Sequence, residues 1–233
     1  LKSLTLWPGR RGSRAPVEII RNGANPRDMQ GDIPADKIEE LKHKLNKKPG
    51  DVFLINTARL VRQKAQDDVI RALPLLPLHV RFLIVGGGDE VPLRKLAQEL
   101  KVSDRVTFVG QVDRDTAALY RKTADIFVAP SRSEGLGNAM LSAMASRLPV
   151  VATQEGGLSD FIFDAHRNPE KETTAWAVDH DNPVQIAKAV EEILANPEKT
   201  KEVTETAHRM VLEEYDWDTV AKMMREKIFS KLI

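Results

Sequence analysis

The chain has 233 residues, of which 42% are hydrophobic and 30% are charged. This balance is typical of a soluble folded protein, it argues against a disordered chain, and the length suffices for one large α/β domain or two small ones. No stretch approaches the roughly 20 apolar residues of a membrane-spanning helix, and the absence of Cys excludes disulfides and thiolate metal sites, which fits a cytoplasmic protein.

The net charge of +1 is unevenly distributed along the chain. Residues 1–27 contain six Lys or Arg and one Glu, a local charge of +5 that leaves −4 for the remainder. We interpret residues 1–16 as a basic arm or hinge that is solvated, because it lacks an amphipathic pattern; contact with anionic lipid or nucleic acid is the alternative. Since the chain begins with Leu1 rather than Met, we expect a fragment or a processed chain.

Short apolar runs and helical periodicities follow one another after this arm. They predict a Rossmann-like parallel sheet with helices on both faces, occupying residues 17–214, and a C-terminal amphipathic helix within 215–233. Strands are predicted at 17–20, 52–55, 81–85, 106–110, 126–129, 149–153 and 175–178. Helices are predicted at 35–45, 66–76, 92–100, 113–122, 138–144, 182–194, 198–214 and 217–232.

Two cations follow the strand at 52–55, in the turn that leads to the next helix. Arg59 and Lys64 are five residues apart, so both can reach an anion above the edge of the sheet. Arg59 would bind it through a bidentate fork and Lys64 as a point charge. The turn is therefore a candidate phosphate site.

Three glycines, residues 86–88, follow the strand at 81–85. A dinucleotide-binding fingerprint would require another glycine where Val91 stands, so that interpretation fails. Two interpretations stay open: a purely structural turn, and a turn that lets the backbone approach a ligand.

The stretch from Pro130 to Phe161 contains two more glycine-rich turns, each directly after a buried strand. The first carries the acid Glu134 and leads to a helix for which Asn138 is the predicted N-cap. The second, Glu155-Gly156-Gly157, leads to a further predicted helix start. Parallel strands place such turns at one edge of the sheet, where α/β proteins bind ligands and helix N-termini attract anions. We predict that this edge faces phosphate and sugar.

Metal and nucleophile chemistry finds little support. Each of three Asp-x-Asp pairs precedes a predicted helix, where capping is the commoner role of Asp, and the five His residues show no ligand spacing. We predict no metal and no cofactor. The three pairs are Asp113/Asp115, Asp179/Asp181 and Asp216/Asp218.

The ordered motifs of this chain resemble the signature of group-1 glycosyltransferases, which are retaining enzymes built from two Rossmann-like domains, the GT-B architecture. The signature belongs to their C-terminal, donor-binding half. Residues 58–65 resemble the family's Gly-Arg-Leu-x-x-x-Lys-Gly, with Ala at both glycine positions, and residues 85–90 its Val-Gly-x-Gly-x-Glu turn. The strongest match comprises Ser133-Glu134-Gly135-Leu136-Gly137, Leu141–Ala145, Leu148–Thr153 and Gly156-Gly157.

The resemblance implies a role for each of these positions. Arg59 and Lys64 would grip the diphosphate of a nucleotide-sugar donor and Glu134 would hydrogen-bond its sugar, and these three are the predicted catalytic residues. The other predicted substrate-binding residues are Gly86 and Gly88 beside the nucleotide, Gln111 and Val112 beside the base, the turn and helix start formed by Gly135, Leu136, Gly137 and Asn138, and Ser142.

Two positions depart from the family pattern. Ser142 stands where the family has a second Glu that meets the ribose, and Arg147 where it commonly has Gly, just past the end of a helix. The last helix resembles one that crosses back to the N-terminal domain, which this chain lacks. The stripe of that helix comprises Trp217, Val220, Ala221, Met224, Ile228 and Leu232.

The resemblance therefore implies the donor-binding half of a glycosyltransferase that moves a sugar from a nucleotide sugar to an unknown acceptor, in glycan, polysaccharide or glycolipid biosynthesis. A non-catalytic nucleotide-sugar binding module, which Ser142 favours, and a GT-B epimerase or phosphorylase stay open. We expect the donor and the missing N-terminal domain as partners, no nucleic acid, a cytoplasmic location, and any membrane contact to be peripheral, at the inner face.

Overall fold

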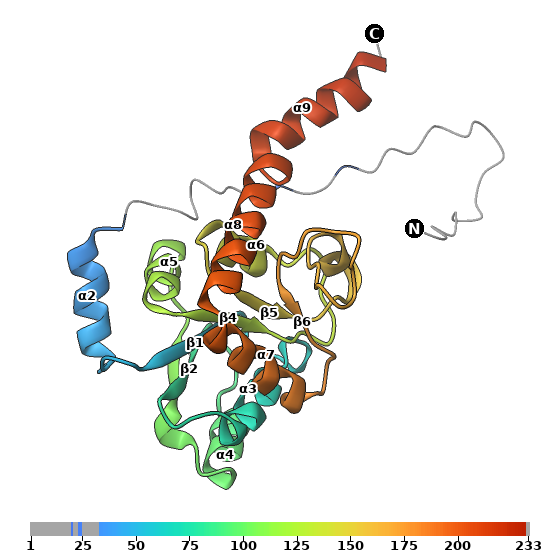
Figure 1. Cartoon of the computed structure of the whole chain (residues 1–233). Coiled ribbons are helices and arrows are strands. Elements are labelled where there is room, and N and C mark those ends of the chain that lie inside the picture. Colours follow the sequence, from blue (N-terminus) through green and yellow to red (C-terminus); the bar gives the residue numbers. More distant parts are fainter. Residues whose placement is uncertain (1–19, 21–22, 25–32, 232–233) are drawn as a thin grey trace, which may run out of the picture.

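The structure, a computed structural model, describes residues 20, 23–24 and 33–231 (Figure 1). The predicted basic arm and nearly all of the predicted strand at 17–20 lie outside these residues.

Six parallel strands form one sheet in the order β3-β2-β1-β4-β5-β6. The chain runs outward from β1 to β3, returns to the middle at β4, and runs outward again to β6. The sheet therefore reverses its winding between β1 and β4, and the predicted fold class is confirmed. The strands are β1 (Val52–Thr57), β2 (Val80–Val85), β3 (Val106–Gly110), β4 (Ile126–Ala129), β5 (Val150–Ala152) and β6 (Trp176–Ala177).

Helices cover both faces of the sheet (Figure 1). Side chains alternate along each strand, so Phe53 and Ile55 of β1 pack into one hydrophobic layer and Leu54 into the other. The helices α3, α4 and α7 pack on the Leu54 side, and α6 and α8 on the Phe53 side. The described helices are α2 (Ala35–Lys44), α3 (Gln66–Ala72), α4 (Val91–Glu99), α5 (Arg114–Thr123), α6 (Asn138–Ala145), α7 (Pro183–Ala195), α8 (Pro197–Glu214) and α9 (Trp217–Lys227).

Four predictions of helix boundaries differ from the structure. The helix predicted at 217–232 is α-helical only to Lys227, and a 3-10 turn over Phe229–Lys231 follows. The helix predicted to reach residue 76 is α-helical only to Ala72, and a 3-10 turn containing Pro74 follows, because proline cannot donate within an α-helix. The prediction of Asn138 as N-cap is wrong: Asn138 is the first residue of α6, and Gly137 caps it with φ 80° and no side-chain bond. The helix start predicted after Gly157 is a 3-10 turn over Gly156–Asp160.

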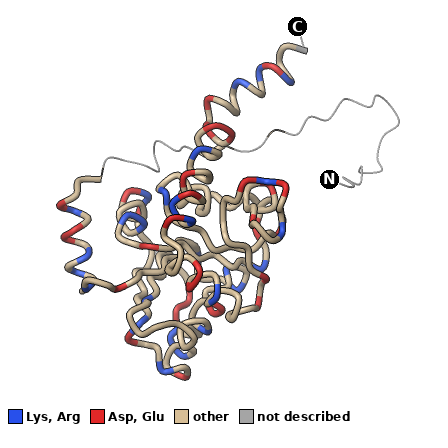
Figure 2. Tube along the Cα trace, viewed as in Figure 1, with Lys and Arg blue, Asp and Glu red and all other residues tan. Residues whose placement is uncertain are grey.

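The C-terminal helix α9 extends away from the sheet (Figure 1). Its N-terminus is capped by Asp216, whose carboxylate accepts from the backbone N–H of Asp218. Within the described part of the predicted stripe only Val220 is buried, whereas Trp217 and Met224 are exposed. Acidic and basic residues alternate along α2 and α9 (Figure 2). The described part of the chain thus covers the apolar stripe only in part.

No helix in the described ranges combines the length and apolar content that crossing a membrane requires.

Candidate functional site

Two adjoining cavities lie at the carboxyl ends of the central strands, beside the point where the winding reverses. The first, of about 250 Å³, is named the Glu134 cavity; its lining includes Asn56, Lys64, Glu134, Leu136, Gly137 and Asn138. The second, of about 400 Å³, is named the Gln111 cavity; its lining includes Arg59, Gly86, Gln111, Val112, Ala117 and Arg121. Thr57 and Ala58 line both, so the two cavities share a wall.

Lys64 and Glu134 form the charged centre of the Glu134 cavity. Lys64 ends a 3-10 turn after β1, and Glu134 lies in the loop after β4, yet their side chains form an ion pair and are only 22% and 14% exposed. The start of α6 completes this wall, because the first N–H groups of a helix lack intrahelical acceptors. A cation, a carboxylate and the first turn of a helix therefore face one small space.

The loop that carries Glu134 is shaped by the glycine pair after β5. A Cβ on Gly156 would lie 2.4 Å from the carbonyl oxygen of Glu134, and a Cβ on Gly157 would lie 1.9 Å from that of Gly135. Any side chain at either position would displace the Glu134 loop. The second predicted glycine turn thus supports the first rather than lining either cavity itself.

Arg132 fastens the same loop to two others. Its guanidinium lies 2.9 and 3.0 Å from the carboxylate oxygens of Asp67, 2.9 Å from Asp68 and 2.7 Å from Asp181. It also donates to the carbonyl oxygen of Arg62, two residues before Lys64. The loops after β1, β4 and β6 are joined through one side chain.

The pKa values of two aspartates that contact Arg132 are shifted in opposite directions. Burial, and next the neighbouring charge of Asp67, raise the pKa of Asp68, although Arg132 acts to lower it. Hydrogen bonds from His180 and Arg132 lower the pKa of Asp181, which is exposed. Sequence reasoning missed this network; the signal was a cation in the same turn as Glu134 and an Asp pair just after Lys64.

The glycines after β2 have a structural reason. A Cβ on Gly86, whose φ is 150°, would lie 2.0 Å from the carbonyl oxygen of Ala58, and a Cβ on Gly88 would lie 2.7 Å from Leu60 Cβ. The loops after β1 and β2 therefore pack backbone against backbone at these positions. Gly86 also lines the Gln111 cavity, whereas Gly88 lines neither cavity.

Arg59 is exposed and belongs to the Gln111 cavity. Among the described residues, no hydrogen bond or ion pair involves its guanidinium. Arg59 and Lys64 thus lie in adjoining cavities on either side of the shared wall, rather than in one.

Nine of the twelve predicted site residues line one or other of the two cavities. The exceptions are Gly88, Gly135 and Ser142. Ser142 is buried, and its hydroxyl donates to the carbonyl oxygen of Asn138 in its own helix at 2.8 Å.

The Gln111 cavity also contains a residue that sequence reasoning missed. Arg121, on α5, is only 5% exposed and lines this cavity. Its position in the last turn of a charged helix gave no signal.

The Asp-x-Asp pairs have two explanations. Asp113 caps α5 by accepting from the N–H of Thr116 at 2.7 Å, which is the main reason that its pKa is lowered, and Asp216 caps α9. Asp179 and Asp181 do not cap: they pair with Arg167 and Arg132. In the part of the chain that the structure describes, no three His, Asp or Glu residues gather where they could hold a metal ion.

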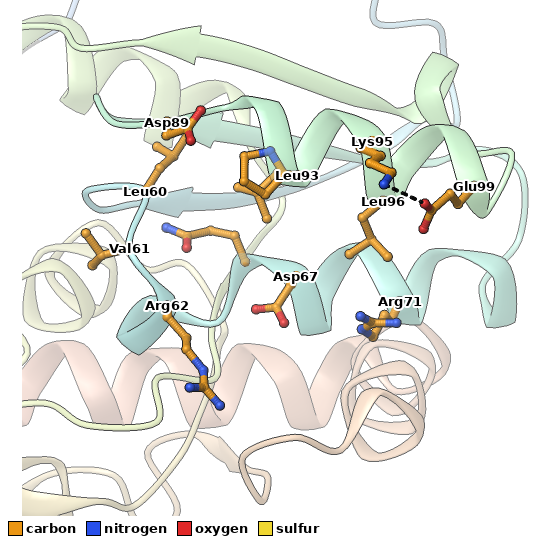
Figure 3. Close-up of a pocket in the computed structure, with 12 residues that line it drawn as sticks. Leu60, Val61, Arg62, Asp67, Arg71, Asp89, Leu93, Lys95, Leu96 and Glu99 are labelled. Carbon is orange, nitrogen blue, oxygen red and sulfur yellow. Dashed lines mark ion pairs between the residues drawn. The ribbon is translucent and has the colours of Figure 1, made fainter.

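A larger hollow, of about 540 Å³, lies between α3 and α4 (Figure 3). Leu60, Leu93 and Leu96 line it, and an ion pair of 3.8 Å between Lys95 and Glu99 lies at one end. None of the predicted site residues lines this hollow. Its lining is mixed, because charged side chains such as Arg62, Asp67 and Arg71 lie beside the leucines.

Known proteins resemble this chain in sequence and in fold. Residues 37–210 match the family model described as "Glycosyl transferases group 1". The GDP-mannose-dependent alpha-(1-6)-phosphatidylinositol monomannoside mannosyltransferase of Mycobacterium tuberculosis is 31% identical over 226 residues, which cover 92% of this chain and 56% of that protein.

Among solved structures, Anabaena HepE in complex with UDP superposes with a TM-score of 0.81 at 20% identity, covering 91% of this chain and 57% of that one. The C-terminal domain of the group 1 glycosyl transferase LpcC from Francisella tularensis superposes with a TM-score of 0.69 at 19% identity, covering 84% of this chain and all of that one.

The chain spans about half the length of the curated relatives that it matches. The family match covers most of the described residues, and the fold agrees with it. The chain belongs to the group 1 glycosyl transferases.

Proposed function

We propose that this chain is the donor-binding half of a retaining glycosyltransferase, and that the two adjoining cavities hold one nucleotide sugar. The Lys64–Glu134 ion pair beside the start of α6 carries the proposal, because it places a cation for phosphate and a carboxylate for sugar hydroxyls in one space. The base would occupy the Gln111 cavity, and the shared wall at Thr57 and Ala58 would lie along the ribose and diphosphate.

In the reaction, the bond between the anomeric carbon and the phosphate oxygen breaks, and the acceptor oxygen attaches to the same face of the sugar. The proton of the acceptor hydroxyl passes to the departing diphosphate. Negative charge develops on the departing diphosphate, where Lys64, Arg59 and the N–H groups at the start of α6 would stabilise it. Glu134 would accept hydrogen bonds from sugar hydroxyls and fix the orientation of the ring.

The donor and the acceptor are proposed at the level of their class. One relative is named as GDP-mannose-dependent and a structural neighbour binds UDP, so a GDP- or UDP-activated sugar is the first candidate. An N-terminal Rossmann-like domain would bring the acceptor, and the exposed stripe of α9 is a surface that it would cover. The product would be a glycan, polysaccharide or glycolipid. The location proposed is the cytoplasm, with peripheral contact at the inner face of a membrane.

Calorimetry on the full chain tests the proposal, with GDP, UDP, GDP-mannose and UDP-glucose as probes. We expect at least one diphosphate to bind, and the matching nucleotide sugar to bind more tightly. Glu134→Gln should keep diphosphate binding and remove most of the added affinity for the nucleotide sugar, because a neutral amide loses its charge-assisted bond to the sugar.

Glu99→Gln, in the hollow between α3 and α4, is the matched control and should change neither affinity. If none of the nucleotides binds, the proposed function is wrong. If Glu134→Gln weakens the diphosphate as much as the nucleotide sugar, the sugar does not lie against Glu134.

A further inference from the structure

Arg121 is buried without the partners that every comparable arginine in the described chain has. It lies on the inner face of α5, and its Nε is buried with no hydrogen-bond partner. No ion pair or side-chain hydrogen bond of its guanidinium with another described residue is found. A buried cation without partners costs free energy, and folded proteins seldom retain one without a reason.

Two other arginines, one buried and one partly buried, show how this fold pairs a guanidinium. Arg105, also 5% exposed, donates to the carbonyl oxygens of Leu73, Leu76, Pro77 and Val80 at distances from 2.7 to 3.3 Å. Arg132 contacts three carboxylates. Arg121 is the exception, and unlike Arg105 it lines a cavity.

The surroundings of Arg121 define the chemistry of what it would bind. Gly86 and Gly87 contribute backbone, Val112 and Ala117 contribute apolar walls, and Gln111 contributes an amide. No carboxylate lines this cavity, so Arg121 and Arg59 leave it cationic. Burial lowers the pKa of Arg121 to about 10, so the guanidinium is charged at neutral pH.

A guanidinium only donates hydrogen bonds, so its ligand must present acceptors. A flat group with apolar faces and an oxygen-bearing edge fits such a space. Guanine offers O6 beside N7 and uracil offers O4, whereas adenine and cytosine present an amino donor at the equivalent edge and would meet Arg121 donor to donor.

We propose that Arg121 is a specificity-determining residue of the donor site, donating to the oxo group of the nucleobase and selecting guanine or uracil over adenine or cytosine. This inference rests on the proposed function, because it requires a nucleotide in the Gln111 cavity. It adds the class of base and the residue that selects it.

The test is calorimetric binding of GDP, UDP, ADP and CDP to the full chain and to two variants. The unaltered protein should bind the better of GDP and UDP at least tenfold more tightly than ADP or CDP. Arg121→Met keeps the length of the side chain and removes its donors, so it should lower affinity for that diphosphate at least tenfold and change ADP and CDP less than threefold. Lys122→Met, next to it on α5 and outside both cavities, is the matched control and should change none of the four.

Thermal melting without ligand separates this role from a structural one. Because Nε has no partner to lose, Arg121→Met should melt at the same temperature as the unaltered chain or higher. A clear fall in melting temperature would show that Arg121 supports the fold, which would overturn the proposal. An equal loss of affinity for all four diphosphates would place Arg121 on the ribose or phosphate and overturn the base assignment. If the unaltered chain binds none of the four diphosphates, both the proposed function and this inference are wrong. If the unaltered chain binds them and Arg121→Met binds them equally well, only this inference is wrong.

Discussion

The two adjoining cavities handle positive charge in opposite ways. In the Glu134 cavity Lys64 is paired with a carboxylate, and the nearby Arg132 is paired with three. In the Gln111 cavity Arg59 and Arg121 have no carboxylate partner among the described residues. The first cavity is therefore close to neutral before a ligand enters, and the second is not.

Because of this difference, substituting a paired charge and substituting an unpaired cation should have different effects on folding stability and on ligand affinity. Removing one partner of a buried pair leaves the other charge uncompensated, so Lys64→Ala should lower both folding stability and affinity, and Arg132→Ala should lower folding stability. Removing an unpaired cation should lower affinity alone. Arg121→Met, described above, tests the second expectation. The following four changes test the first and the surroundings of the two cavities, beginning with the largest expected effect.

Arg132→Ala should lower the free energy of unfolding by about 2–4 kcal/mol, because it leaves Asp67, Asp68 and Asp181 facing one another without their shared cation. Urea denaturation followed by circular dichroism measures the change. Arg209→Ala is the control: its pair with Glu172 is exposed and should contribute under about 1 kcal/mol. Equal effects of the two changes would mean that the Arg132 network is not a structural support.

The free energy of unfolding that Arg132→Ala loses, its stability deficit, should depend on pH. Arg132 acts to lower the pKa of Asp68 and of Asp181 in the folded state. Without it these folded-state pKa values rise, so the folded variant binds protons that the unfolded chain has released. The deficit is then largest near neutral pH and shrinks as the pH falls toward 3.8, the ordinary pKa of Asp. A deficit that stays constant between pH 7 and pH 4 would contradict this account.

Lys64→Ala should weaken binding of a nucleoside diphosphate by about 1.5–3 kcal/mol, the range for a hydrogen bond to a charged group. It should also lower folding stability, since Glu134 loses its partner. Calorimetry and urea denaturation measure the two effects. Lys95→Ala, an exposed lysine of α4, should change neither quantity. Unchanged diphosphate affinity would remove Lys64 from the phosphate site.

Ser142→Glu should tighten a ribonucleoside diphosphate by roughly 1 kcal/mol, because a carboxylate can accept from both ribose hydroxyls and the Ser hydroxyl is bonded to Asn138. The 2′-deoxy analogue should gain little. Ser142→Ala is the matched variant and should leave the affinity unchanged. The same gain for both nucleotides, or none, would show that position 142 does not face the ribose.

Arg147 lies outside both cavities. Arg147→Gly should have the smallest effect, from no change to about 1 kcal/mol of added folding stability. Arg147 has φ 57°, in the left-handed region, and glycine adopts that conformation without strain. The change loses only an exposed pair with Glu205. A clear fall in melting temperature would show that Arg147 makes a contact that the fold needs.

The same change should move the titration of His208. Burial is the first cause of its lowered pKa and the charge of Arg147 the second, so Arg147→Gly should raise that pKa toward the ordinary value, which NMR titration measures. Because a lowered His pKa makes the folded state less stable as the pH falls, the variant should lose less stability between pH 8 and pH 5.

The sequence predicted the strands because each is a short apolar run, and it placed Lys64 and Glu134 correctly at the sheet edge because each follows such a run. It did not predict the partners of Arg132, which are 65 and 49 residues away and become neighbours only when the loops after β1, β4 and β6 meet. Arg121 was missed because a helical pattern does not reveal that a polar residue faces inward.

Local sequence also misassigned the residue that caps α6. Asn138 has a capping side chain, but the chain enters the helix through a left-handed residue, and Gly137 adopts that conformation more readily. The reason for Gly86 was likewise non-local, because the atom that excludes a side chain there is the carbonyl oxygen of Ala58, 28 residues earlier.

The order of the strands has a consequence for how the two cavities can change during evolution. The Gln111 cavity takes its distinctive residues from the loops after β2 and β3 and from α5, whereas the Glu134 cavity takes its own from the β4 loop and α6. Only the β1 loop serves both. Under the proposed function, substitutions that alter which base is accepted therefore need not disturb the groups that hold the sugar. Descendants of one ancestor could then exchange the nucleotide carrier and keep the transferred sugar, or the reverse, by changing separate stretches of chain.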